Sequence, residues 1–195
     1  MDRKVYCGAM LLASIVATGC AEQKKVEEKK PNIIYFLVDD MGMGDLSLTG
    51  QKKYETPNID KLAADGMLFT NHYCGTTVSG PSRACLMTGK HTGHTSVRGN
   101  QPGPQLLGDN EATLASVLKG AGYKTAVIGK WGIGHPIPQD DPQRKGFDLS
   151  YGYLNMWHAH NCFPEFLYRN GVKEELTGNK LALAEDGTNP WADMP

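Results

Sequence analysis

The 195-residue sequence has almost no net charge, no regular cysteine pattern and no internal repeat. Lysine and arginine total 20 against 21 aspartate and glutamate residues, which gives a formal net charge of −1 at pH 7. A chain without a positive field has no compositional reason to bind nucleic acid. We therefore expect no nucleic-acid partner.

Cysteine is too scarce and too irregular to organise the fold. There are five cysteines, of which Cys7 and Cys20 fall in the first twenty residues, leaving Cys74, Cys85 and Cys162. An odd number at irregular spacing predicts neither a disulfide scaffold nor a zinc site. The apolar content is still sufficient for one packed domain of about 175 residues.

The N-terminus has the order of a secretory signal. Arg3 and Lys4 precede the apolar run 9–17, which is too short to span a membrane, and small residues lead to Cys20. Residues 17–20 resemble a bacterial lipobox, in which Cys20 becomes the lipidated N-terminus; an ordinary signal peptide with an incidental cysteine is the alternative. We expect a signal peptide over 1–19, a charged tether over 20–30 and a folded region over 31–195. The implied location is the bacterial cell envelope, periplasm or outer membrane, with a lipid anchor holding the protein to the membrane.

The segment 76–90 contains the strongest functional signal. Pro81 suits the start of a helix, which we expect to begin at residue 80 or 81 and to continue through Met87. Ser79 would then lie just outside the positive end of the helix, with Arg83 one turn later. A hydroxyl, a guanidinium and several free backbone N–H groups could face one tetrahedral anion, either sulfate or phosphate. A serine that merely caps the helix is the plainer alternative.

Two polar groups follow predicted strands. The apolar run 32–38 is typical of a strand buried on both faces of a parallel sheet, and it ends at Asp39 and Asp40. The run 123–128 predicts a second strand, followed by Gly129 and Lys130. Since open α/β sheets bind ligands at the carboxyl ends of their strands, we expect these side chains at one edge.

The remaining pattern alternates helices and strands. Residues 56–66 and 110–120 predict helices closed by glycine, residues 67–73 predict a strand, and residues 166–172 predict a short strand and turn. This alternation favours a parallel sheet covered by helices. The polar segment 91–100 is rich in groups that can contact an anion, but its histidines receive no role.

Two motifs in the sequence resemble those of the sulfatases. The first resembles the sulfatase signature and consists of Ser79, Pro81, Ser82 and Arg83, followed by Leu86 to Gly89. The second is Gly129-Lys130-Trp131. The resemblance implies that Ser79 is oxidised to formylglycine by a serine-type sulfatase-maturing enzyme, and that the hydrated aldehyde attacks sulfur. It further implies that Asp39, Asp40 and residue 79 hold Ca²⁺ or Mg²⁺, and that Arg83 and Lys130 bind the sulfate. Hard oxygen ligands suit either cation.

The sequence departs from the family at an informative position. Gly132 stands where most members have a histidine that assists breakdown of the sulfated intermediate, and His135 is a candidate to replace it. His158 and His160 correspond to a segment that lines the substrate side of the pocket, although a turn with exposed histidines is an equal alternative. Family members are also considerably longer, and their later Asp-Asn-Gly metal motif has no counterpart here.

The resemblance implies an α/β fold of the alkaline-phosphatase-like type, with a mainly parallel central sheet flanked by helices and incomplete at the C-terminus. The implied activity is sulfuric ester hydrolysis, with a sulfated small molecule or glycan as substrate. Two alternatives stay open: a phosphatase-type esterase that uses unmodified Ser79, and an inactive lipid-anchored remnant or glycan-binding module.

Overall fold

The computed structural model describes residues 29–100, 106–133 and 141–179, and the chain divides into two units, Met1–Val38 and Asp39–Pro195. In the first unit the described residues are extended, exposed and not part of any strand. Ile34 and Phe36 are 78% and 81% exposed. The prediction of a strand buried on both faces over 32–38 is therefore wrong for this structure. Apolar sequence indicates a need for burial, whereas a strand also requires a neighbour to which it can hydrogen-bond.

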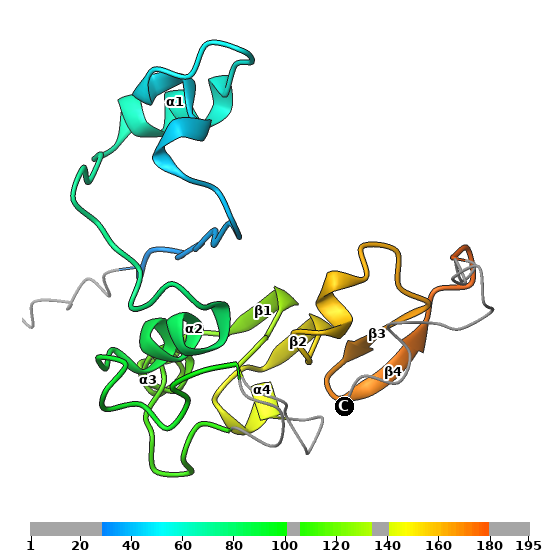
Figure 1. The fold of residues 1–195 in the computed structure, drawn as a ribbon. Coiled ribbons are helices and arrows are strands. Elements are labelled where there is room, and N and C mark those ends of the chain that lie inside the picture. The colour runs from blue at the N-terminus through cyan, green and yellow to red at the C-terminus, as the bar shows by residue number, and fades with distance from the viewer. Residues whose placement is uncertain (1–28, 101–105, 134–140, 180–195) are drawn as a thin grey trace, which may run out of the picture. The chain divides into compact units, whose positions relative to one another are not determined.

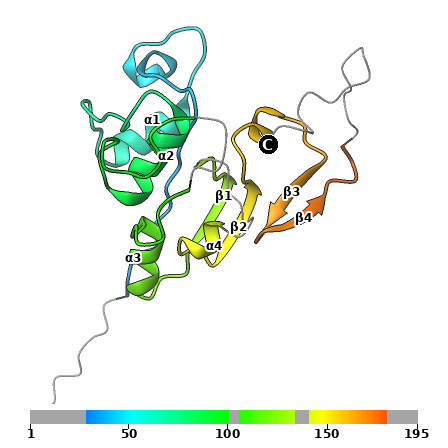
Figure 2. The ribbon, with the colours of Figure 1, turned by 60° about the horizontal axis from the view of Figure 1, so that its bottom comes forward.

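The second unit contains a four-stranded mixed sheet (Figure 1). Its strands are β1 (Ala126–Lys130), β2 (Leu149–Tyr153), β3 (Phe166–Arg169) and β4 (Val172–Glu175), and they lie side by side in that order (Figure 2). The β1–β2 pair is parallel, whereas β2–β3 and β3–β4 are antiparallel. The fold is thus mixed α/β, and only one of the three strand pairs has the predicted parallel direction.

The β3–β4 hairpin confirms the strand and turn predicted over 166–172. Arg169 pairs with Val172, so the loop contains only Asn170 and Gly171, both with positive φ (50° and 81°). Two successive residues with positive φ form the tight turn that matches the twist of the strands, and Asn-Gly is the preferred pair for it.

The helices are α1 (Pro57–Asp65), α2 (Ser79–Thr88), α3 (Leu114–Gly120) and the short α4 (Asp141–Arg144). Short 3₁₀ turns occupy Met43–Asp45, Ser47–Thr49 and His158–His160. The α1 prediction is confirmed, with Pro57 as its first residue. None of the helices among the described residues has the length and apolarity needed to cross a membrane.

Helix α3 begins four residues later than predicted. Its N-cap is Thr113, whose hydroxyl oxygen accepts from Ser116 N–H at 3.0 Å, while Thr113 N–H donates to Ser116 Oγ at 2.8 Å. This reciprocal pair satisfies two groups at the helix end, so Thr113 is a better start than Asn110.

The segment 67–73 is not a strand, contrary to prediction. Met67, Phe69 and Tyr73 are 77%, 68% and 79% exposed. The segment leads to α2 without pairing with any of the four strands. As with 32–38, its β-type composition does not supply the partner that a strand needs.

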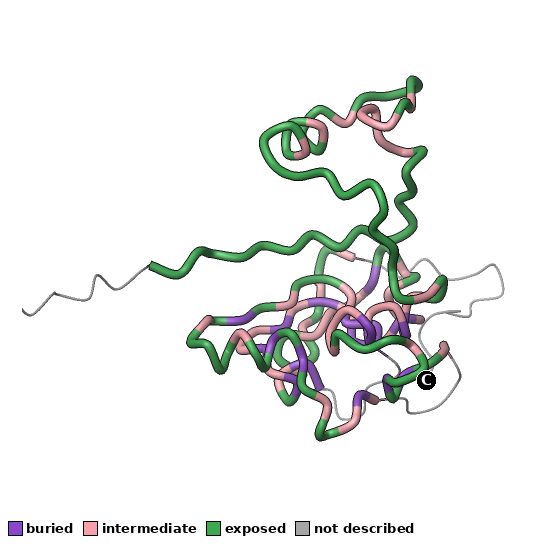
Figure 3. Tube along the Cα trace, turned by 90° about the vertical axis from the view of Figure 1, so that its left-hand side faces the viewer, coloured by how far each residue is buried: buried purple, intermediate pink, exposed green. Residues whose placement is uncertain are grey.

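The core of the second unit joins α2 and α3 to the residues that follow β1 and precede β2, and buried residues are coloured purple in Figure 3. Its buried side chains come from both helices, from the loop after α2 and from the residues around β1, namely Ala84, Val97, Leu107, Ala115, Trp131, Ile133 and Phe147. Trp131 packs edge-on against Phe147, with 5.9 Å between ring centroids. Because Trp131 directly follows Lys130, this packing fixes the end of β1.

Two glycines are register partners in strands β1 and β2. Gly129 pairs with Gly152, and Gly152 has a φ of +141°. A Cβ atom added at Gly152 would lie 2.1 Å from the carbonyl oxygen of Gly129 and 2.9 Å from its Cα. Only glycine permits this spacing and this backbone conformation.

We predict that Gly152→Ala separates the parallel pair and lowers the free energy of unfolding by about 2 kcal/mol or more, as overpacking against rigid backbone does. Gly120→Ala is the matched control, since nothing lies within 4 Å of a Cβ added there. Urea unfolding of both variants measures the difference. Equal stability of the two variants would contradict the close approach described here.

Candidate active site

Ser79 is the first residue of α2 rather than a residue just outside it. Val78 occupies the N-cap position with extended backbone, and Ser82 N–H donates to Val78 O at 3.1 Å. Pro81 is therefore the third residue of the helix, where its missing N–H still costs nothing. The helix ends at Gly89, which has a φ of +66° and donates its N–H to Cys85 O.

Arg83 connects the first turn of α2 to the end of β1. Its Nε donates to Ser79 Oγ at 3.1 Å, and one terminal nitrogen donates to the backbone carbonyl of Lys130 at 2.9 Å. Only 14% of the side chain is exposed. The guanidinium thus orients the Ser79 hydroxyl and fixes the position of Lys130 at the same time.

Asp39 lies between two cations. Its carboxylate binds the Lys130 ammonium and lies 3.5 Å from the second terminal nitrogen of Arg83. The hydrogen bond from Lys130 is the largest influence that lowers the pKa of Asp39, and the charge of Arg83 adds to it. Burial lowers the pKa of Arg83, and Asp39 opposes that effect. Together, Ser79, Arg83, Lys130 and Asp39 form one contiguous group, and two of its members could bind an oxyanion.

Asp40 is exposed and has a φ of +56°, a left-handed conformation that aspartate tolerates better than most residues. Among the described residues, no three His, Cys, Asp or Glu side chains gather closely enough to hold a metal ion. Asp39 and Asp40 offer hard oxygens, but the carboxylate of Asp39 is already bound to Lys130. The described donors therefore do not complete a site for Ca²⁺ or Mg²⁺.

The start of α2 offers fewer free N–H groups than the sequence suggested. Gly80 N–H donates to Asn100 Oδ1 at 3.0 Å, Pro81 has no N–H, and Ser82 N–H is bonded within the helix. The prediction of several free donors facing an anion is therefore wrong. The positive charge of Arg83 and Lys130 is the stronger feature of the site.

The stems of Lys130 and Arg83 pack against Gly132, the position at which the sequence departs from the sulfatase motif. Gly132 has a φ of +59°. A Cβ added there would lie 2.9 Å from Lys130 Cγ, 3.2 Å from Lys130 Cδ and 3.3 Å from Arg83 Cδ. In this arrangement, the stems of the two cationic side chains occupy the space that a side chain at 132 would need.

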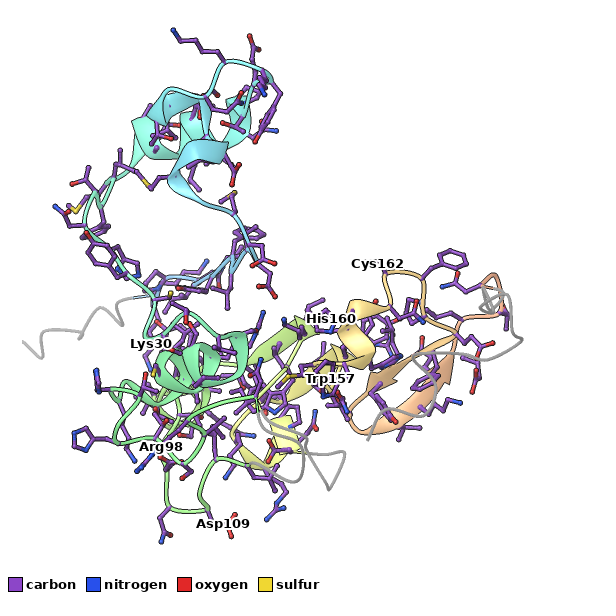
Figure 4. All side chains as sticks on the ribbon, viewed as in Figure 1. Lys30, Arg98, Asp109, Trp157, His160 and Cys162 are labelled. Carbon is purple, nitrogen blue, oxygen red and sulfur yellow. The ribbon has the colours of Figure 1, made fainter. Side chains whose placement is uncertain are left out.

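The two predicted substrate-side histidines lie in the 3₁₀ turn after β2, where Figure 4 labels His160 beside Trp157. His158 stacks on Phe166 at 4.4 Å between ring centroids and meets Tyr153 edge-on at 5.0 Å. Burial lowers the pKa of His158, with a smaller contribution from Lys173. His160 lies against Trp157, at 5.8 Å between ring centroids. The ring contacts of His158 thus tie it to the hairpin.

Tyr153 relates this segment to the rest of the site. Tyr153 is the register partner of Lys130 in the parallel β1–β2 pair. Strand β2 therefore ends at the same edge of the sheet as β1, which ends at Lys130. His135 and Cys20 fall outside the described residues, as do the predicted signal peptide and nearly all of the tether. The sequence pattern marks 91–100 as polar but does not distinguish Asn100, which contacts the start of α2.

A sulfatase family model matches residues 31–190. The chain therefore belongs to the sulfatase family. An oxyanion site formed by Arg83 and Lys130 beside Ser79 is consistent with this family. The match confirms the resemblance drawn from the motifs around Ser79 and Lys130.

Several of its relatives are named for the 6-sulfate of an amino sugar. The chain is 44% identical over 135 residues to the N-acetylgalactosamine-6-sulfatase of Sus scrofa, covering 64% of this chain and 26% of that protein. It is also 44% identical over 123 residues to an N-acetylgalactosamine-6-O-sulfatase of Bacteroides thetaiotaomicron, covering 60% and 24%. The chain thus spans about a quarter of the length of the curated relatives it matches, and it is related to carbohydrate 6-O-sulfatases.

Solved structures agree with this relationship. The Ps i-CgsB structure matches with a TM-score of 0.66 and 31% identity, covering 76% of this chain and 38% of that one. A structure reported for the metabolism of multiple glycosaminoglycans by Bacteroides thetaiotaomicron matches with a TM-score of 0.64 and 34% identity, covering 80% and 33%.

We predict that Gly132→Ala destabilises the protein more than Gly89→Ala does. Both glycines lie in the left-handed region, with φ of +59° and +66°, so both variants carry backbone strain of about 1–2 kcal/mol. Nothing lies within 4 Å of a Cβ at Gly89, whereas one at Gly132 meets the Lys130 stem. Urea unfolding measures the difference, and Gly132→His should lose at least as much stability. A fully stable Gly132→His variant would contradict this packing.

Proposed function

We propose that the chain is the part of a sulfuric ester hydrolase that carries the nucleophile and the sulfate-binding cations. The observation that carries the proposal is the grouping of Ser79, Arg83 and Lys130, since Arg83 bonds both to the Ser79 hydroxyl and to the Lys130 carbonyl. A nucleophile precursor within reach of two cations suits attack on a sulfate ester, whose oxygens gain charge in the transition state.

The roles of the residues follow from their positions. Arg83 holds residue 79 in place and supplies a planar cation to a sulfuryl oxygen, and Lys130 supplies a second positive charge. Asp39 holds the Lys130 ammonium in the absence of substrate. Formylglycine at position 79 would supply a hydrated aldehyde. One of its oxygens would bond to sulfur as the S–O bond to the alcohol breaks, and loss of the proton from its other hydroxyl would then expel sulfate and restore the aldehyde.

Asp39 and Asp40, together with residue 79, are the proposed protein ligands for a Ca²⁺ or Mg²⁺ ion. The described residues provide too few oxygens for a complete site, because calcium takes six to eight. Further ligands must therefore come from outside the described part of the chain or from water. His135 is the proposed residue for proton transfer in place of a histidine at Gly132.

The proposed substrate is a sulfated glycan, consistent with relatives named for the 6-sulfate of N-acetylgalactosamine. His158 and His160 are proposed to contact the esterified group, and their place at the same end of the sheet as Lys130 supports this. We further propose an alkaline-phosphatase-like fold with a mainly parallel central sheet for the complete domain, beginning at residue 31 after a signal peptide and tether.

Ser79 should become formylglycine when the chain is co-expressed with a serine-type maturing enzyme. Mass spectrometry of the tryptic peptide 62–83 would show the loss of two hydrogens at Ser79. Expression without the maturing enzyme is the control. An unmodified serine in both samples would favour the two alternatives, a serine phosphatase or an inactive glycan-binding remnant, and turnover of a phosphate ester would separate those two.

Residues 21–195 alone should be a poor sulfatase even with formylglycine installed. Each missing charge-stabilising donor typically costs about 10²–10³ in rate, and two carboxylates hold a calcium ion weakly. Assays on an aryl sulfate with and without calcium would compare this chain with a version extended by the C-terminal part of a relative. Fast, calcium-dependent turnover by the short chain would overturn our account of the ligands.

Cys20 is proposed to carry the lipid that anchors the protein in the cell envelope. Because one acyl chain anchors only weakly, several chains would be needed. Replacing Cys20 by Ala should move the protein from the membrane fraction to the soluble fraction of the cells, with Cys7→Ala as a comparison. Unchanged membrane association of Cys20→Ala would exclude the anchor.

A further inference from the structure

Asn100 contacts the start of the nucleophile helix although it lies twenty residues further along the chain. Its Oδ1 accepts from Gly80 N–H at 3.0 Å, and Gly80 is buried. The helix has no cap of its own, since Val78 at the N-cap position makes no side-chain hydrogen bond. Asn100 therefore performs the capping that Val78 cannot.

This contact depends on the absence of a side chain at position 80. A Cβ added to Gly80 would lie 2.5 Å from Asn100 Oδ1, 3.3 Å from Met156 Cε and 3.5 Å from the carbonyl oxygen of Gly132. Three separate segments thus meet at Gly80, and one of them carries Gly132, on which the stems of Lys130 and Arg83 rest. Asn100 is therefore part of the packing that fixes the position of Ser79 relative to Arg83 and Lys130.

We propose that Asn100 is a positioning residue of this site, which rests on the proposed sulfatase function. By occupying Gly80 N–H, it fixes the first turn of α2 and removes the donor that an oxyanion at the helix end would otherwise use. A sulfuryl group is then directed to Arg83 and Lys130 instead of settling on the backbone N–H of the helix. The amide is neutral, so it performs this task without repelling the sulfate.

The test uses isotopically labelled full-length protein and inorganic sulfate as the probe. In Asn100→Ala, Gly80 N–H loses its partner, so its hydrogen exchange should become about five- to tenfold faster, the factor expected for one lost hydrogen bond. Ser82 N–H, which bonds to Val78 O, should keep its rate. Sulfate should shift the Gly80 amide resonance in Asn100→Ala but not in the wild type.

A charged variant separates capping from positioning. Asn100→Asp keeps an acceptor for Gly80 N–H, so exchange at Gly80 should stay slow, but its negative charge next to the anion should weaken sulfate binding severalfold. A cap that lies away from the bound anion would leave the sulfate affinity of this variant unchanged. Asn58→Ala, on the exposed face of α1, is the matched control and should alter neither readout.

Each outcome decides the inference. Unchanged exchange at Gly80 in Asn100→Ala, or a wild-type Gly80 resonance that already moves with sulfate, would overturn it. If exchange responds as expected but sulfate perturbs no residue around Ser79 in the wild type, the proposed function fails and Asn100 is reduced to a helix cap. The expected result is selective exposure of Gly80 together with a sulfate-dependent shift of its amide only when Asn100 is removed.

Discussion

The site depends on one largely buried guanidinium. Arg83 contacts Ser79 on its own helix, the carbonyl of Lys130 at the end of β1, and the carboxylate of Asp39 at the start of the second unit. These three groups lie far apart in sequence, and the rigid fork of arginine has enough donors for all of them. A lysine at position 83 would offer one compact ammonium without that geometry, so the identity of this residue sets the arrangement of the nucleophile and the second cation.

Local signals in the sequence predicted the helix that carries the site. Pro81 marks the start of α2 to within two residues, and the predicted end at Met87 is one residue short of the observed end at Thr88, because proline acts through backbone geometry alone. The β3–β4 hairpin was predictable for the same reason, since Asn170 and Gly171 adopt the positive φ values that its two-residue turn requires. Lys130 was expected at a strand end and is the last residue of β1.

Sequence reasoning failed where a contact partner decides the outcome. The run 32–38 has the composition of a buried strand, yet its described residues are exposed and unpaired with β1 to β4. Strand β2 is the opposite case, because it forms without having been predicted. Its buried positions are Ser150 and Gly152, while Tyr151 and Tyr153 are half-buried. An alternation of small buried residues with aromatic ones does not resemble the usual strand pattern. Asn100 was missed because its partner lies twenty residues away.

Three close contacts in and around the site require glycine, because a Cβ atom at these positions would collide with neighbouring atoms. Gly152 lets β2 approach β1, Gly80 lets Asn100 reach the start of α2, and Gly132 leaves room for the stems of Lys130 and Arg83. Gly132 stands where the family motif has a histidine. In this structure the stems of Lys130 and Arg83 take up the space beside position 132. The space is filled by two cationic side chains whose charges lie beside Ser79 and Asp39. Glycine at position 132 supplies no proton donor, and our proposal gives that role to His135.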